Sequence, residues 1–487
     1  MPATLFAMND DRRSGRRARI ERSLRWLERY RPIVDDMQGF LAALEEPPPV
    51  DLMVPRGAER RREVAARLEA RGLATRTFDW APRHLRLESP LPGGALPEVV
   101  FGLAFRQGVV SSLPCRALDP HPGERILDLC AAPGGKTVLL ASLAEDRARI
   151  LAGDPSASRA GLLVQSLSRM GLTSVITVQQ DGNGFPAAAP FDAILLDAPC
   201  TGEGIFRVGR PRYEPTGEQG VLRARALQRR LISRAADLLA PGGRMVYSTC
   251  SYAPEENEGV ISDLLARRDD LRIEALPDGI PGSPGLTRWG EIGFHPDLPR
   301  ARRLYPHQTG SWGFFLCLLR KDPDSGHYTS GSRREDRPRV EPVDDPEAAA
   351  ELRAALEPFG VGREVLDTYH VMPRGKDLWI LSRCCPAGSD TDVSRLKIVA
   401  PGLRALRRTP RGPRLPNGVL RALDRHLGAR VVELEWDQAL ALLEEREQAA
   451  APDAPVGQVA LRAGGQVIGA GYQRGGRLYL ELPKAWR

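Results

Sequence analysis

The feature that most constrains the fold is a regular alternation of strand-like and helix-like segments between about residues 123 and 320. Six short segments rich in aliphatic residues have the length of buried strands, and stretches with helical spacing separate most of them. The strand candidates are ERILDL, ARILAGD, SVITVQQD, FDAILLDAP, GRMVYSTC and GFFLCLL. The clearest helices are predicted at residues 157–170, 221–239 and 255–267. This alternation predicts an α/β fold with a doubly wound, mostly parallel sheet.

Two smaller folded parts are expected on either side of this sheet. Residues 1–115 form a predicted α+β domain, and residues 116–320 hold the sheet. Elements of the first part are expected at residues 24–44 and 59–71 (helices) and 74–87 (short strands). Residues 321–348 have almost no apolar content and many turn formers, so they are predicted to be a linker or loop. Residues 349–487 form a second predicted α+β domain.

Composition narrows the class of protein. The 487 residues are 42% hydrophobic and 27% charged, as in soluble globular proteins of several domains. No apolar run reaches 18 residues, and the basic N-terminus lacks the apolar stretch of a secretory signal. Seven cysteines without a C-x-x-C pair argue against a zinc site and for reduced thiols. We therefore expect a cytoplasmic monomer with no membrane segment and no bound metal.

Positive charge is concentrated in one stretch near the C-terminus. The net charge is +7, and residues 396–430 contain nine basic residues and a single acid, Asp424. The basic residues are Lys397, Arg404, Arg407, Arg408, Arg411, Arg414, Arg421, Arg425 and Arg430. A solvated surface is one interpretation. Contact with a nucleic acid is the other, because a stretch of one sign repels itself unless an anion neutralises it.

A glycine-containing loop follows the first predicted strand, where the chain reads AAPGGKT before a helix. Small residues and paired glycines at this place let the backbone approach a cofactor at the helix N-terminus. The dinucleotide fingerprint G-x-G-x-x-G is absent. A phosphate loop would match Gly135, Lys136 and Thr137 but would need its first glycine at Cys130. Both nucleotide-binding alternatives are therefore disfavoured.

An acidic residue follows each of the next three strands: Asp154, Asp181 and Asp197. In a doubly wound sheet all three lie on the carboxyl edge, around the crevice where the strand order reverses. An acid after the second strand can accept hydrogen bonds from both ribose hydroxyls of an adenosyl cofactor. A turn or helix cap is the alternative for any one of them, but three beside the loop favour a cofactor site.

Cysteines end the fourth and fifth strands, in DAPCTGEG and STCSYAPEENE. With strand order 3-2-1-4-5 these strands are neighbours roughly 5 Å apart, so Cys200 and Cys250 should face one crevice. A lone cysteine is more often a small apolar residue than a nucleophile. Two at adjacent strand ends are harder to explain by packing, and backbone N–H groups and Lys136 are expected to lower a thiol pKa there.

The segments LDLCAAPGGKT, DAPCTGEGIFR and STCSYAPEENE closely resemble the Sun/Nop-type RNA cytosine-5 methyltransferases, a class I methyltransferase family with a Rossmann-like sheet. The similarity extends to RRLYPHQTGSWGFF and, more weakly, to FLAALEEPP. The wording GEGIFR and the C-terminal VIGAGYQRGGRLYLELPKAWR look like the bacterial RsmF-like branch. That branch methylates 16S ribosomal RNA and carries a PUA-like C-terminal domain.

The resemblance implies a role for particular residues. Cys250 matches the nucleophile that adds to cytosine, and Cys200 matches the cysteine that helps to release the enzyme from the methylated base. Lys136 and Asp197 match residues next to the target base. The contacts to S-adenosylmethionine correspond to Cys130, Ala131, Ala132, Pro133, Gly134, Gly135, Lys136, Asp154, Arg159, Asp181 and Asp197. The resemblance also implies that the first and last domains bind RNA, either free ribosomal RNA or the small ribosomal subunit.

Two departures from the family pattern concern the first domain. An R-V-N-like stretch is replaced by Leu52-Met53-Val54-Pro55-Arg56, and the usual Q-E/D before the Ser-Ser pair becomes Gly108-Val109. Both departures lie in or beside the first domain, so they bear on how RNA is placed more than on the chemical steps. Three alternatives stay open: a transfer RNA cytosine-5 methyltransferase, a DNA enzyme that uses the cysteine of Pro199-Cys200, and a catalytically silent RNA-binding assembly factor. In the DNA-type arrangement Cys200 is the nucleophile, and Cys250 would have no role in catalysis.

Overall fold

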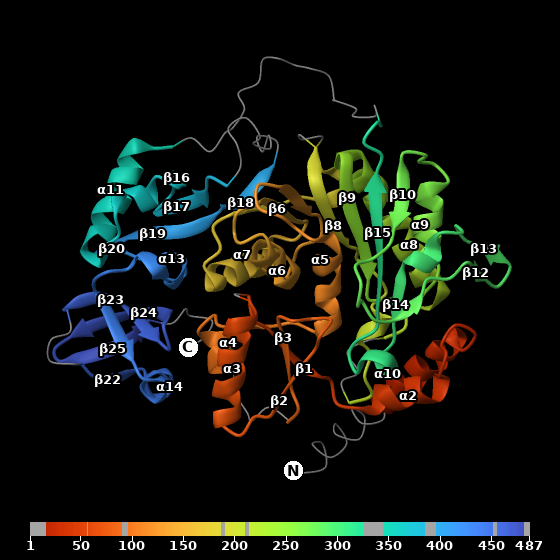
Figure 1. Cartoon of the computed structure of the whole chain (residues 1–487), viewed down its shortest axis with the longest axis horizontal. Coiled ribbons are helices and arrows are strands. Elements are labelled where there is room, and N and C mark those ends of the chain that lie inside the picture. Colours follow the sequence, from red (N-terminus) through yellow and green to blue (C-terminus); the bar gives the residue numbers. More distant parts are fainter. Residues whose placement is uncertain are drawn as a thin grey trace, which may run out of the picture.

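A computed structural model describes residues 16–55, 57–89, 96–186, 190–209, 214–325, 344–384, 396–450 and 455–481. At its centre lies a large mixed sheet with helices on both faces (Figure 1). Its parallel part consists of β5 (Arg125–Asp128), β6 (Arg149–Asp154), β7 (Val175–Gln179), β8 (Phe191–Asp197) and β9 (Leu239–Thr249). The spatial order β7-β6-β5-β8-β9 confirms the predicted order 3-2-1-4-5.

The alternation of side chains along the strands divides the core into two layers. Ile126 and Ile150 pack on one face with α5 (Leu113–Leu118), α6 (Gly135–Leu143) and α7 (Ala157–Met170). Their neighbours Leu127 and Leu151 pack on the other face with α8 (Gly217–Leu238) and α9 (Glu258–Leu265). Because successive strand residues point to opposite faces, apolar runs such as RILD bury the sheet on both sides.

Antiparallel strands extend the sheet at both edges. Next to β9 lies β15 (Phe314–Lys321), which pairs with β10 (Leu271–Glu274) and β14 (Arg302–Leu304), and β14 pairs with β11 (Ser283–Pro284). At the far edge, β18 (Lys397–Pro401) pairs antiparallel with β7. The sequence did not predict this last strand, which reaches the sheet from the expected C-terminal domain. Residues 326–343 of the expected linker lie outside the described residues.

The N-terminal part differs from the expected single helix at residues 24–44. A helix covers residues 16–27, and after a turn α2 runs over Met37–Glu45. The break occurs at Asp36, whose extended backbone and side chain cap α2 by accepting a hydrogen bond from Gly39 N at 2.9 Å. The expected second helix is α3 (Ala58–Ala70). A four-stranded sheet follows, made of β1 (Val50–Met53), β2 (Thr75–Thr77), β3 (His84–Leu87) and β4 (Phe105–Arg106).

Two sheets form the C-terminal part. The first contains β16 (Tyr369–Arg374), β17 (Asp377–Ser382), β19 (Leu403–Thr409) and β20 (Gly412–Arg414). The second contains β21 (Val431–Leu434), β22 (Glu447–Ala449), β23 (Gly457–Ala463), β24 (Gln466–Arg474) and β25 (Arg477–Glu481). The helices are α11 (Pro346–Leu356), α13 (Asn417–Ala422) and α14 (Trp436–Glu445). No helix in the described ranges is long and apolar enough to cross a membrane.

The N-terminal sheet with α3 packs against the last sheet of the C-terminal part (Figure 1). Leu52 and Leu68 share one apolar cluster with Leu442 and Val459. Arg67 lies over the ring of Trp436, 4.6 Å from its centre. The N-terminal sheet is therefore supported by the C-terminal part on one side and leads into the central sheet on the other.

Candidate active site

The glycine-containing loop connects β5 to α6, as the sequence predicted. Gly134 has φ 109°, and a Cβ there would lie 2.8 Å from Leu163 Cδ1, so the loop needs glycine both for its conformation and for its approach to α7. Below the loop, the Thr137 hydroxyl donates to Asp128 Oδ2 at 2.7 Å. This bond joins the end of β5 to the first turn of α6 and fixes the loop between them.

The three acids lie along one edge of the sheet. Asp154 ends β6 and Asp197 ends β8, while Asp181 follows β7 and caps the next turn by accepting from Asn183 N at 3.0 Å. Asp154 is 1% exposed, and Arg159 Nη2 lies 3.2 Å from its Oδ2. Arg159 also donates to Ala132 O at 2.9 Å. It thus connects the loop to the acid at the end of β6.

Lys136 joins the loop to the end of β8. Its Nζ lies 2.7 Å from Asp197 Oδ2 and 2.8 Å from Ser111 Oγ, and Ser248 Oγ donates to Asp197 Oδ1 at 2.8 Å. Burial lowers the pKa of Lys136, but the Asp197 carboxylate more than offsets this, so the pKa is raised and the ammonium stays charged. The charge of Lys136 also interacts with Cys250.

A cavity of about 190 Å³ opens over the loop and this ion pair. Its lining combines the loop with the segment between β4 and α5. The lining residues are Phe105, Arg106, Gln107, Gly108, Ser111, Cys130, Ala131, Ala132, Pro133, Gly135, Lys136 and Asp197. Residues 105–111 lie within the range expected for the first domain, so the N-terminal part forms one wall of the site. The sequence analysis did not predict that this segment borders the site, although the polar residues of Q-G-V-V-S-S after an apolar run were a signal for it.

Cys200 and Cys250 face each other with their Sγ atoms 3.3 Å apart. This agrees with the prediction that adjacent strand ends bring both into one crevice. The hydrogen bond with Cys250, followed by burial, raises the pKa of the Cys200 thiol well above its usual range. The prediction of a lowered thiol pKa is therefore wrong for Cys200, which keeps its proton. The hydrogen bond with Cys250 and the burial of the thiol both favour its neutral form.

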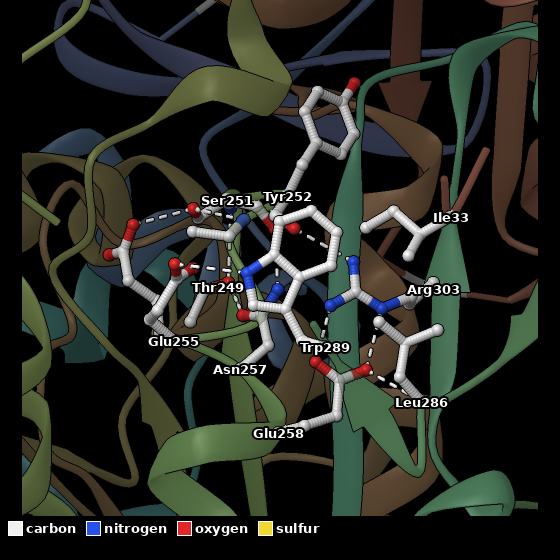
Figure 2. A network of polar contacts seen from close by, with 12 residues as sticks. Ile33, Thr249, Ser251, Tyr252, Glu255, Asn257, Glu258, Leu286, Trp289 and Arg303 are labelled. Carbon is white, nitrogen blue, oxygen red and sulfur yellow. Dashed lines mark hydrogen bonds and ion pairs between the residues drawn. The ribbon is translucent and has the colours of Figure 1, made fainter. Parts of the chain in front are cut away.

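Backbone hydrogen bonds hold the Cys250 turn in place. Gly204 N donates to Cys250 O at 2.8 Å, and Gly313 N donates to Gly204 O at 2.9 Å. Figure 2 shows the side chains around the same turn. The Thr249 hydroxyl donates to Asn257 Oδ1 at 2.6 Å, and Asn257 Nδ2 donates to Ser251 O at 2.9 Å. The sequence showed the letters E-E-N-E after the cysteine but not what they contact.

A second set of bonds in Figure 2 joins this turn to the antiparallel half of the sheet. Arg303 and Glu258, both almost fully buried, form an ion pair through two guanidinium nitrogens, with Nε 2.7 Å from Oε1. Arg303 Nη1 also donates to Tyr252 O at 2.9 Å. This pairing raises the pKa of Arg303, although burial opposes it, so the charge on the guanidinium is retained.

The departures from the family pattern have a structural counterpart. A Cβ on Gly108 would lie 2.5 Å from Trp312 Cδ1, so glycine there leaves room for the indole ring. The guanidinium of Arg207 lies over the same ring, 4.8 Å from its centre. In the other departure, Leu52 and Val54 are fully buried in the N-terminal core. Arg56 lies outside the described residues.

The basic stretch at residues 396–430 is ion-paired in part within the chain. Arg404 and Arg407 both pair with Asp377, with Nε–O distances of 2.8 and 3.0 Å. Arg408 pairs with Glu351. The argument from self-repulsion therefore fails for these arginines, because the structure brings carboxylates from other elements to them. No group of three or more potential metal ligands occurs among the described residues.

Comparisons with known proteins identify the family. The family model described as 16S rRNA methyltransferase RsmB/F matches residues 115–320. The ribosomal RNA small subunit methyltransferase F of Serratia proteamaculans is 31% identical over 397 residues, which cover 80% of this chain and 80% of that protein. The chain belongs to the RsmB/F methyltransferase family. The resemblance inferred from the motifs is thereby confirmed.

Other relatives are similar over the central part of the chain. The human 28S rRNA (cytosine(4447)-C(5))-methyltransferase is 38% identical over 300 residues, which cover 60% of this chain and 37% of that protein. The chain thus spans well under half the length of this relative. A solved methyltransferase homologue from Pyrococcus horikoshii is 35% identical with a TM-score of 0.52, covering 58% of this chain and 90% of that one. The central sheet is that of a class I methyltransferase.

Proposed function

We propose that the protein transfers a methyl group from S-adenosylmethionine to carbon 5 of a cytosine in RNA, through a covalent adduct with Cys250. The observation that carries the proposal is the pair of thiols 3.3 Å apart at the carboxyl edge of the sheet, beside the Lys136–Asp197 ion pair. Family membership supports it, since the matching model describes 16S rRNA methyltransferases. A silent assembly factor would have no need for two facing thiols.

The residues present fit an adenosyl cofactor. Asp154 at the end of β6 supplies an acceptor for ribose hydroxyls once Arg159 moves aside, and Asp181 supplies an acceptor one strand further along. The loop from Cys130 to Lys136 borders the cavity where the reacting end would lie. Bound S-adenosylmethionine supplies the methyl group as an electrophile.

The chemistry assigned to the side chains begins with Cys250. Its thiolate forms a bond to carbon 6 of cytosine, which makes carbon 5 nucleophilic. Asp197, held by Lys136 and Ser248, lies beside ring N3, and the ammonium of Lys136 in the same ion pair compensates the negative charge developing on the ring. After methyl transfer the proton on carbon 5 leaves to a base, and the bond between Cys250 and carbon 6 breaks. A base within a helix must first be unstacked.

Cys200 is the proposed release residue. Its thiol lies within reach of the adduct, and its raised pKa keeps it protonated while Cys250 attacks. After methyl transfer the Cys200 thiol passes its proton to solvent, and the resulting thiolate takes the proton from carbon 5. The electron pair of that C–H bond re-forms the double bond between carbons 5 and 6, and the bond from carbon 6 to Cys250 breaks with its electron pair returning to sulfur. The DNA-type alternative assigns attack to Cys200 instead and leaves Cys250 without a role, although the two thiols face each other.

One gel tests this division of labour. The parent, Cys250→Ala and Cys200→Ala are incubated with RNA, with and without S-adenosylmethionine, and run under denaturing conditions. We expect Cys250→Ala to give neither methylation nor a slow band, and Cys200→Ala to accumulate a covalent RNA complex. A covalent complex from Cys250→Ala would contradict the assignment. No methyl transfer by the parent would contradict the enzyme proposal.

We further propose that 16S ribosomal RNA, free or in the small subunit, is the substrate of a cytoplasmic monomer, with N-terminal and PUA-like C-terminal parts that bind RNA. A cavity of about 820 Å³ in the C-terminal part supports RNA contact. Its lining includes Tyr472, Tyr479, Arg411 and Arg474, together with Arg414 and Glu481, which pair with each other, and neither Arg411 nor Arg474 has an ion-pair partner among the described residues. Aromatic rings and free guanidinium groups suit stacked bases and phosphates.

Bisulfite sequencing of ribosomal and transfer RNA from a deletion strain tests the substrate. Loss of one or more methylated cytosines from 16S RNA is the expected result. Loss from transfer RNA alone would favour the alternative substrate, and an unchanged pattern in both would contradict an RNA cytosine-5 activity in the cell.

A further inference from the structure

The residue that follows each cysteine is hydrogen-bonded to the same carboxylate. Thr201 N donates to Glu256 Oε2 at 3.1 Å, and the Thr201 hydroxyl donates to Oε1. Ser251 Oγ donates to Glu256 Oε1 at 2.7 Å. The turn carrying Cys200 and the turn carrying Cys250 are thus joined one residue away from the thiols. Glu256 itself follows the second cysteine by six residues.

Glu256 is held from a third element. Gln228 on α8 donates from Nε2 to Glu256 Oε2 at 2.7 Å and to Pro199 O at 2.9 Å. The phenol of Tyr247 donates to the backbone oxygen of Glu256 at 2.6 Å. With four donors on its two oxygens, the carboxylate has a single orientation, and its position depends on β9, α8 and the turn after β8 together.

This carboxylate is not placed to act on a base directly. Glu256 is fully buried, and both of its carboxylate oxygens are occupied by donors from the protein. Its donors are all groups of the two cysteine turns and of α8. Its effect on chemistry must therefore pass through the positions of the two thiols.

We infer that Glu256 is a positioning residue that keeps the Cys200 and Cys250 turns in register, so that Cys200 reaches the adduct that Cys250 forms. The inference rests on the proposed function for its consequence in catalysis, but the geometric statement stands without it. A hydrogen bond to a buried carboxylate restrains both turns more strongly than a neutral bond would. Loss of the carboxylate removes the acceptor of Thr201 N, leaves Gln228 bonded only to Pro199 O, and frees each turn to move separately.

The test uses Glu256→Ala, Glu256→Gln and a control, Asp146→Ala. Asp146 is also a buried carboxylate that joins neighbouring segments, accepting from Thr173 N at 2.8 Å and Ser174 N at 3.0 Å. It lies just before β6, at the opposite edge of the sheet from the thiols. Its loss should lower stability comparably without touching the cysteine turns.

Glutamine at position 256 should largely rescue function. Its carbonyl oxygen can accept from the two fixed N–H donors, Thr201 N and Gln228 Nε2. Its amide can donate to the hydroxyl oxygens of Thr201 and Ser251, since hydroxyl groups rotate. Rescue by glutamine and failure of alanine would identify hydrogen bonding between the turns as the property that matters.

The first readout needs no activity. Diamide oxidises two facing thiols to a disulfide and is itself reduced, and peptide mass spectrometry measures how fast Cys200 and Cys250 become linked. We expect Glu256→Ala to slow this at least about tenfold, a factor equivalent to about 1.4 kcal/mol. The parent rate is expected for Glu256→Gln and Asp146→Ala. Linkage in Glu256→Ala at the parent rate would overturn the inference whether or not the protein methylates RNA.

The second readout is the fate of the RNA adduct in the full-length protein. Glu256→Ala should accumulate a covalent complex, as Cys200→Ala does, and adding Glu256→Ala to Cys200→Ala should slow release no further. Release that slows by the same factor in both backgrounds would show an effect independent of Cys200 and would overturn the inference. An inactive parent with slowed linkage in Glu256→Ala would instead contradict only the proposed function.

Discussion

The buried carboxyl of Asp128 should make the free energy of unfolding decrease as pH rises. Asp128 ends β5, is 1% exposed, and burial raises its pKa from 3.8 to about 7, although the hydrogen bond from Thr137 and the charge of Lys136 oppose the shift. Between these two values the folded protein binds more protons than the unfolded chain. The free energy of unfolding therefore decreases with rising pH over this range, and the decrease ends above about pH 7.

The size of the effect follows from the shift. A difference of about three pKa units corresponds to roughly 4 kcal/mol when integrated over the whole range, and to roughly 2 to 3 kcal/mol between pH 5 and pH 8. Asp128→Asn removes the ionisation while keeping an oxygen that can accept from Thr137. We expect the free energy of unfolding of the variant to lose this share of its pH dependence. The free energy of unfolding of Asp128→Asn minus that of the parent should therefore be larger at pH 8 than at pH 5.

Urea unfolding of the parent and Asp128→Asn at pH 5, 6, 7 and 8 measures the effect, because all other titrating groups cancel in the difference. Asp146→Asn is a second test of the same reasoning, since burial also raises the pKa of this carboxyl, which lies before β6 and away from the cofactor loop. Its free energy of unfolding relative to the parent should likewise be larger at high than at low pH. A difference between parent and Asp128→Asn that stays constant across these pH values would refute the reasoning.

Three further outcomes test other parts of the site. Asp154→Ala should weaken S-adenosylmethionine binding, measured by calorimetry, more than about tenfold through lost charge-assisted hydrogen bonds, and unchanged binding would remove Asp154 from the site. Gly204→Ala would place a Cβ 2.3 Å from Gly313 O and 2.9 Å from Cys250 O. It should lower the free energy of unfolding by about 1 to 3 kcal/mol and slow methyl transfer. A free energy of unfolding and a methyl-transfer rate equal to those of the parent would show that the turn adapts. Replacing Arg411 and Arg474 by glutamine should flatten the dependence of log RNA affinity on log salt by about 1.4, or 0.7 per phosphate contact, whereas an unchanged slope would exclude this cavity as an RNA contact.

The central sheet was predictable because its signals are local. Each buried strand is a short apolar run, and each helix between strands repeats at helical spacing, as α7 at Ala157–Met170 does. The loop of Gly134 and Gly135 follows from the needs of a close turn after β5. Once the strand order was assumed, the meeting of Cys200 and Cys250 followed from the spacing of neighbouring strands.

Contacts between distant segments were decided only by the tertiary structure. The carboxylates of Asp377 and Glu351 neutralise arginines that look unpaired in the linear sequence, and β18 joins the sheet although it begins at Lys397. Glu256 is one of several charged residues in the sequence E-E-N-E. Its contacts with the turn after β8 and with α8 exist only in the folded protein. A sequence pattern reports burial and period along one element. Which polar groups meet depends on how elements far apart in the chain pack together.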